Sequence, residues 1–199
     1  MKRALISVYD KTDIVSFTRE LCKLGFEIIS TGGTYETLKE GGIPFVKHVS
    51  DVTNFPELLE GRVKTEHPKL MAGILALREN KKHVEDLERQ GITPIDMVVS
   101  NLYPFEKVTE QGADLRTALE NIDIGGPNMI RAAAKNFENV VVIVNPRRYC
   151  QISREYKTNG DVSLETRKVL AVEAFKETAR YDSAICRFLE KSFSKLSTS

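Results

Sequence analysis

Short apolar runs alternate with amphipathic helical patterns along most of this chain. The runs cover residues 3–8, 26–30, 44–49, 73–77, 95–101 and 140–144. Several of them are almost wholly apolar, which is typical of strands in a parallel sheet that helices cover on both faces. A chain of 199 residues with 41% hydrophobic composition is long enough for one well-buried core and short for two. We therefore predict an α/β fold in which residues 1–199 form one domain.

The segments between these runs carry helical signals. We predict helices near residues 14–24, 34–41, 80–90, 115–121 and 127–136, and one long amphipathic helix from residue 163 with a frayed end at 197–199. Asp13 and Thr34 are the expected N-caps of the first two helices.

Charge and composition exclude several classes of protein. Lys and Arg number 29 against 28 Asp and Glu, so no global field attracts nucleic acid or an anionic membrane. No apolar run approaches the roughly 20 residues of a membrane span, and the N-terminus lacks the features of a signal peptide. We expect a cytoplasmic protein with reduced, mostly buried cysteines, because three distant cysteines do not form a disulfide framework. His48, His67 and His83 show no metal-ligand spacing, so no metal site is predicted.

Ligands of parallel α/β sheets bind at the carboxyl ends of the strands. This rule selects the loops at residues 9–12, 31–34 and 100–104. In the second loop, Gly32 and Gly33 permit a ligand to approach the main chain closely. The helix that follows directs N–H groups and a partial positive charge at the same space, which favours an anion. The alternative is an ordinary strand-to-helix turn.

The segment EGRVKTEHPKL (60–70) carries a local cluster of positive charge. Arg62 and Lys64 point the same way if the segment is extended, because side chains alternate with a period of two. Together with Thr65, these two side chains are suited to bind one phosphate. The alternative is an exposed basic turn.

The segment NIDIGGPNMIRAAAKN (121–136) sets Asp123 before two glycines and Lys135 at the end of a helix. Asp123 is a candidate helix cap or ligand contact. Lys135 has an ordinary explanation as a cation that complements the helix dipole. Tyr103, in the turn NLYPF, has a similar alternative as a packed hydrophobe.

Taken together, the motifs resemble one family. SVYDKT, STGGT, GRVKTEHP, NLYPF, IDIGGPNMIRAAAKN and SLETRKVLAVEAFKETARYD are similar to the inosine monophosphate (IMP) cyclohydrolase half of the bifunctional purine-synthesis enzymes, whose other half is a transformylase. The resemblance implies a methylglyoxal-synthase-like, Rossmann-like three-layer fold with a mainly parallel sheet and a long C-terminal helix. It also implies dehydrative ring closure of formamidoimidazole carboxamide ribonucleotide (FAICAR) to IMP, the last step of de novo purine biosynthesis, with no cofactor and no metal.

The resemblance further implies the residues of the site. The expected nucleotide contacts are Tyr9, Asp10, Lys11, Thr31, Gly32, Gly33, Thr34, Arg62, Val63, Lys64, Thr65, Ser100, Asn101, Asp123, Ile124 and Gly125. Lys135 matches the position of proton transfer, and Lys64, Tyr103 and Asp123 are its expected companions. The chain departs from the family pattern at Tyr9, Glu66 and Met71, where serine, leucine and histidine are expected.

Two other functions are compatible with the glycine loop. Methylglyoxal synthase shares the fold and a similar loop, and the same fold serves as a nucleotide-sensing domain of larger enzymes. The expected partners are the nucleotide substrate, a second copy in a homodimer and a covalent or separate transformylase, because no transformylase half is present. Neither nucleic acid nor a membrane is expected.

Overall fold

Five parallel strands form the centre of the computed structural model, which describes residues 1–196. They are β1 (Lys2–Val8), β2 (Phe26–Ser30), β3 (Val46–His48), β4 (Met97–Asn101) and β5 (Val141–Ile143), in the order β3-β2-β1-β4-β5. Leu5 of the central strand β1 pairs with Ile29 of β2 and with Val98 of β4, and all three side chains are buried. The predicted parallel sheet is confirmed.

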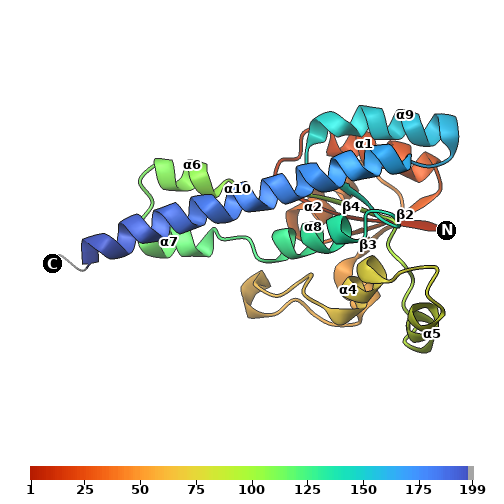
Figure 1. Ribbon diagram of the computed structural model, residues 1–199, viewed down its shortest axis with the longest axis horizontal. Helices are drawn as coiled ribbons and strands as arrows, with labels where there is room; N and C mark the ends of the chain where they lie inside the picture. Colours follow the sequence, from red (N-terminus) through yellow and green to blue (C-terminus); the bar gives the residue numbers. More distant parts are fainter. Residues whose placement is uncertain (197–199) are drawn as a thin grey trace.

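Helices cover both faces of this sheet (Figure 1). On one face lie α1 (Ile14–Lys23), α2 (Gly32–Glu40) and α9 (Tyr149–Asn159), and on the other lie α4 (Pro68–Leu75) and α8 (Gly125–Lys135). The long helix α10 (Leu164–Leu196) packs along α8 and β5 and continues past the sheet, where it contacts α6 (Phe105–Glu110). The predicted three-layer fold with a long C-terminal helix is therefore confirmed.

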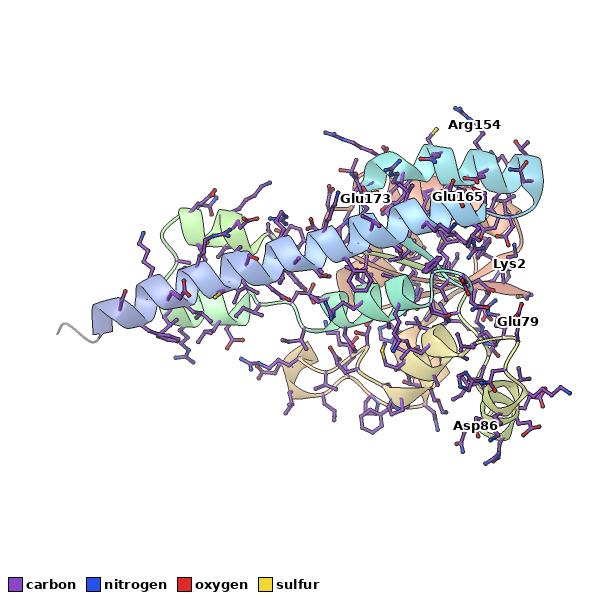
Figure 2. All side chains as sticks on the ribbon, viewed as in Figure 1. Lys2, Glu79, Asp86, Arg154, Glu165 and Glu173 are labelled. Carbon is purple, nitrogen blue, oxygen red and sulfur yellow. The ribbon has the colours of Figure 1, made fainter. Side chains whose placement is uncertain are left out.

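Shorter elements connect these layers. They are α3 (Val49–Thr53), α5 (Lys81–Arg89), α7 (Leu115–Glu120) and the 3₁₀ turns η1 (Leu59–Gly61) and η2 (Pro146–Arg148). Helix α5 stands apart from the sheet, and its labelled Asp86 faces solvent (Figure 2). None of the helices in residues 1–196 is long and apolar enough to cross a membrane.

The predicted strand at residues 73–77 is wrong. This run belongs to α4, which begins at Pro68 after the His67 ring accepts a hydrogen bond from the Lys69 N–H. Gly73 packs closely there, because a Cβ at this position would lie 3.2 Å from the carbonyl oxygen of Thr93. A five-residue apolar run does not distinguish a buried strand from a buried helix, and the capping residues decide the outcome.

One predicted helix cap is wrong, and the other has the predicted position without a side-chain bond. The N-cap of α2 is Thr31, and the helix begins at Gly32 rather than after Thr34. Thr34 is buried instead, and its hydroxyl accepts from the Val8 N–H (3.0 Å) and donates to the Val8 carbonyl (2.9 Å). Asp13 does precede α1, but it has a left-handed backbone (φ 56°) and makes no side-chain cap bond.

All three cysteines are free thiols, as expected, but the prediction that they are mostly buried is wrong. Cys22 is half-buried, whereas Cys150 and Cys186 lie on exposed sides of α9 and α10. A helical pattern predicts which residues form the buried face of a helix. It does not predict the burial of a residue at the edge of that face. The predicted fraying at residues 197–199 lies outside the described residues.

Candidate active site

Asn101, at the carboxyl end of β4, connects two of the predicted loops through hydrogen bonds of its side chain. Its side-chain oxygen accepts from the backbone N–H groups of Tyr9 (2.7 Å) and Asp10 (2.8 Å). Its amide nitrogen donates to the carbonyl of Asp10 at 3.1 Å. Because β1 and β4 are parallel neighbours, both loops leave the sheet at the same edge. The structure therefore brings the first and third predicted loops together.

Lys11 folds back onto the end of β1. Its ammonium group donates to the carbonyl oxygens of Val8 and Tyr9. Burial lowers the pKa of Lys11, and the neighbouring Asp10 carboxylate opposes that shift. An ammonium group has three N–H donors, so one donor of Lys11 is left for an anionic ligand at this edge.

The glycine loop, residues 31–34, follows β2 and includes the first residues of α2. Gly32 has a left-handed backbone (φ 55°), and a Cβ there would be 3.5 Å from the Lys64 ammonium nitrogen. A Cβ at Gly33 would meet no atom within 4 Å, so the space beside this residue is open. The Thr31 hydroxyl donates to the Glu57 carboxylate at 2.5 Å. The loop thus offers free backbone N–H groups with Lys64 beside them.

The expectation that Arg62 and Lys64 share one extended stretch is wrong. Residues 59–61 form a 3₁₀ turn, and Leu58 bridges to Val63 across it. Arg62, directly after this turn, has a helical backbone (φ −69°, ψ −21°), so side chains do not alternate with a period of two from Arg62 to Lys64. Arg62 pairs with Glu120 of α7, whereas the Lys64 ammonium lies 3.7 Å from Glu57.

Asp123 and the two glycines after it form a close-packed corner. The Asp123 carboxylate accepts from the Gly126 N–H at 2.8 Å. A Cβ at Gly126 would approach Asp123 Oδ2 to 2.6 Å, and a Cβ at Gly125 would approach Thr65 Oγ1 to 2.4 Å and Glu66 Oε1 to 2.6 Å. Only glycine fits at these two positions, so residues 65–66 pack directly on the first turn of α8.

The surroundings of Asp123 raise the pKa of its carboxyl group above the ordinary value. Burial raises the pKa of its carboxyl group, and the negative charge of Glu66 raises it further. Hydrogen bonds from the N–H groups of Gly126 and Tyr103 and the positive charge of Lys64 act in the opposite direction. A carboxyl group with a raised pKa beside a lysine is typical of an acid–base site.

Two exposed tyrosines flank this edge. The rings of Tyr9 and Tyr103 lie 5.3 Å apart, and about half of each side chain is exposed. Tyr103 is therefore not the packed hydrophobe of the alternative interpretation. Ser100 is buried, and within residues 1–196 its hydroxyl has no hydrogen-bond partner. Ile124 is exposed, and Thr65 is buried.

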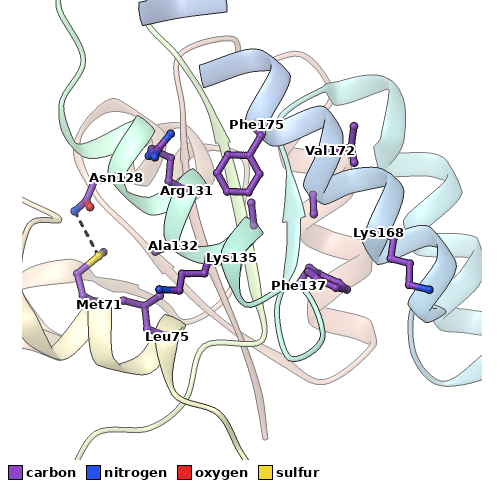
Figure 3. Close-up of a pocket in the computed structure, with 12 residues that line it drawn as sticks. Met71, Leu75, Asn128, Arg131, Ala132, Lys135, Phe137, Lys168, Val172 and Phe175 are labelled. Carbon is purple, nitrogen blue, oxygen red and sulfur yellow. Dashed lines mark hydrogen bonds between the residues drawn. The ribbon is translucent and has the colours of Figure 1, made fainter. Parts of the chain in front are cut away.

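Lys135 lies at the opposite end of α8 from Asp123. It ends α8, whose eleven residues begin at Gly125 beside Asp123. At about 1.5 Å per residue, the two ends of this helix are roughly 15 Å apart. Lys135 instead lines an apolar groove of about 740 Å³ with Leu75 of α4 and Phe175 of α10 (Figure 3). Within one chain, the structure does not bring Lys135 to Asp123.

Glu57 and Tyr181 belong to this region and were not predicted. Glu57 contacts Thr31 and Lys64, and the Tyr181 hydroxyl of α10 accepts from the Asp123 N–H at 2.8 Å. Glu57 stands in none of the quoted motifs, and Tyr181 stands in the last of them with no predicted role. Only the folded chain places them beside the glycine loop and Asp123. Within residues 1–196, no group of three or more His, Cys, Asp or Glu side chains is placed to hold a metal ion.

Known proteins resemble this chain along nearly its whole length. It is 55% identical over 192 residues to the bifunctional purine biosynthesis protein PurH of Persephonella marina and 54% identical over 192 residues to that of Acetivibrio thermocellus. Each alignment covers 96% of this chain and 37% of the relative. The chain therefore spans little more than a third of the length of these relatives.

Comparisons of the fold and with family models agree with this similarity to purine biosynthesis proteins. A solved structure described as the crystal structure of ForH matches with a TM-score of 0.86 and 33% identity, over 96% of this chain and 98% of that one. Residues 133–199 match the family described as AICARFT/IMPCHase bienzyme, and residues 13–128 match the MGS-like domain. The resemblance drawn from the sequence motifs is confirmed, and the chain belongs to the MGS-like domain family.

Proposed function

We propose that this chain is an IMP cyclohydrolase, which closes the ring of FAICAR to give IMP and water. The observation that supports it most is the convergence of the glycine loop, Lys64 and Asp123 at the carboxyl edge of the sheet. The curated relatives, which are purine biosynthesis proteins, agree with this assignment.

Ring closure requires a base and a proton donor. The carboxamide nitrogen of FAICAR is a poor nucleophile, because its lone pair is delocalised into the carbonyl group. A base therefore removes a proton from this nitrogen as it bonds to the formyl carbon. A donor stabilises the formyl oxygen, which gains negative charge and is protonated. As this oxygen leaves as water, the formamido nitrogen loses its own proton and forms a C=N bond to the former formyl carbon. Both groups lie on adjacent ring carbons, so the enzyme mainly holds their orientation and transfers protons.

The residues of the site fit these two tasks. In our proposal the Asp123 carboxylate accepts the nitrogen proton, and Lys64 and Tyr103 donate to the formyl oxygen. Lys11 and the N–H groups of the first turn of α2 bind the phosphate. Thr34 contributes through its backbone, because its hydroxyl is already bonded to Val8.

Turnover of FAICAR tests this proposal. We expect the purified chain to convert FAICAR to IMP, followed by ultraviolet absorbance, and to do so in excess EDTA because the chemistry needs only proton transfer. Dihydroxyacetone phosphate is the control substrate, and it should yield no methylglyoxal. Binding of IMP without turnover would support a nucleotide-sensing domain instead, and methylglyoxal formation would support a synthase.

A second copy of the chain provides a role for Lys135. Four exposed residues, Ile124, Asn128, Arg131 and Lys135, form one stripe along α8 at helical spacing. Two α8 helices packed antiparallel across a two-fold axis place Lys135 of one copy beside Asp123 of the other. Our proposal is a homodimer of this kind, in which Lys135 transfers protons at the site of the neighbouring copy.

A transformylase completes the proposed set of partners. FAICAR carries a formyl group that an earlier transfer reaction must add to an amine. The relatives are described as bifunctional and are more than twice as long as this chain. A transformylase, either fused or separate, is therefore proposed as the source of the substrate.

A further inference from the structure

Glu57 joins three separate elements of the candidate site. One oxygen of its carboxylate accepts from the Thr31 hydroxyl (2.5 Å), at the N-cap of α2, and lies 3.5 Å from Nε2 of His48, at the end of β3. The other oxygen lies 3.7 Å from the ammonium nitrogen of Lys64. About 30% of the Glu57 side chain is exposed, so these contacts are partly shielded from water.

The hydrogen bonds of His48 show which ring nitrogen faces Glu57 as a donor. Nδ1 accepts from the backbone N–H of Ser50 at 3.3 Å, where it caps α3. The neutral ring therefore carries its proton on Nε2, the nitrogen that faces the carboxylate. Thr31, His48 and Lys64 all present N–H or O–H groups to Glu57, so its charge is well compensated.

Two glycines shape the space that Lys64 occupies. A Cβ at Gly61 would lie 2.6 Å from Cε and 2.9 Å from the ammonium nitrogen of Lys64, and one at Gly32 would lie 3.5 Å from that nitrogen. Both glycines have left-handed backbones. The Lys64 side chain thus passes between two main-chain segments that approach it closely, and Glu57 is the carboxylate that pairs with its charge.

The charge of Glu57 also restricts how a nucleotide lies in the site. A phosphate dianion is repelled by a nearby carboxylate, so it is not expected on the Glu57 side of the glycine loop. Lys11 supplies positive charge at the end of β1, where its ammonium group donates to the carbonyl of Val8. The heterocycle of FAICAR then lies toward Lys64 and Asp123.

From these contacts we propose that Glu57 is a positioning residue of the cyclohydrolase, which holds the Lys64 ammonium group over the glycine loop. This inference rests on the proposed function, and it adds a residue that itself touches no reacting atom. Glu57 acts through Lys64, so its loss affects the reaction more than it affects nucleotide binding.

Glu57→Gln tests this role, because glutamine keeps the size of the side chain and still accepts from Thr31 while it removes the charge. We expect kcat for ring closure to fall about 10- to 100-fold and KM for FAICAR to stay within about threefold. Glu57→Asp, which restores the charge on a shorter side chain, should recover part of the rate. Glu60→Gln is the matched control, because Glu60 is an exposed carboxylate three residues along the chain, in the turn η1. A Glu57→Gln variant with the kcat of this control overturns the inference.

Crystal structures of the wild type and Glu57→Gln provide a readout that does not depend on activity. We expect Lys64 to lie over Gly32 in the wild type and to leave that position in the variant. An unmoved Lys64 contradicts the positioning role even if kcat falls. If the wild-type protein does not convert FAICAR at all, the proposed function fails, and the same two structures still decide whether Glu57 positions Lys64.

Discussion

Replacement of Lys135 by alanine is expected to lower the rate of ring closure by a factor of about 10² to 10⁴. Binding of IMP should persist, because the proposed phosphate contacts at Lys11 and α2 lie elsewhere. Single-turnover kinetics and an IMP titration measure the two effects separately. If Lys135 only complements the dipole of α8, its loss costs about 0.3–1 kcal/mol of stability and leaves turnover nearly intact.

Mixed dimers show whether Lys135 acts in the neighbouring copy. Asp123→Asn and Lys135→Ala are each expected to be nearly inactive alone. In a mixed dimer, one of the two sites combines an intact Asp123 with an intact Lys135 from the other chain. An equimolar, re-equilibrated mixture should therefore recover about a quarter of the wild-type activity, since half of the dimers are mixed. No recovery in a mixture shown to contain mixed dimers contradicts a contribution across the interface.

Loss of the Asp123 carboxylate is expected to lower the ring-closure rate by a factor of about 10² or more, because the proposed base is removed. The pH dependence of wild-type activity provides a second test of Asp123. The carboxylate must be ionised to accept a proton, so activity falls as the pH falls through its pKa. Burial and Glu66 raise this pKa above its ordinary value of 3.8. The acid limb of kcat/KM should accordingly lie at a higher pH than that of an ordinary aspartate.

Glu66→Gln separates this electrostatic effect from other causes of an acid limb. Removal of the Glu66 charge removes one contribution that raises the pKa of Asp123, so the acid limb should move to lower pH. Glu60→Gln removes the same charge from the nearby turn and should leave the limb in place. A limb that does not move in Glu66→Gln, or that moves to higher pH, shows that Asp123 is not the titrating group.

Much of the fold follows from local patterns in the sequence. The strands β1, β2 and β4 are apolar runs bounded by polar loops, and their parallel pairing follows from the helices between them. Helix α4 was missed because its apolar run has the length of a strand, and its start depends on capping by His67. The cap of α2 was misplaced because both Thr31 and Thr34 are good N-cap residues, and only the hydrogen bonds of the Thr34 hydroxyl to Val8 of β1 separate them.

The part of the site that the parallel sheet positions was predictable from the sequence. Loops that follow parallel strands meet at one edge, and the contacts of Asn101 with Tyr9 and Asp10 place two of them there. The contacts of Glu57 and Arg62 depend on the 3₁₀ turn between them, and no periodic pattern in the sequence predicts this turn. The position of Lys135 depends on the length of α8, which carries it to the opposite end of the helix from Asp123.

A crystal structure of the protein with bound IMP tests the central claim most directly. We expect the phosphate to contact Lys11 and the first turn of α2, and the hypoxanthine ring to lie between Lys64 and Asp123. A nucleotide bound away from the carboxyl edge, for example in the apolar groove between α4, α8 and α10, would contradict the assignment of this site.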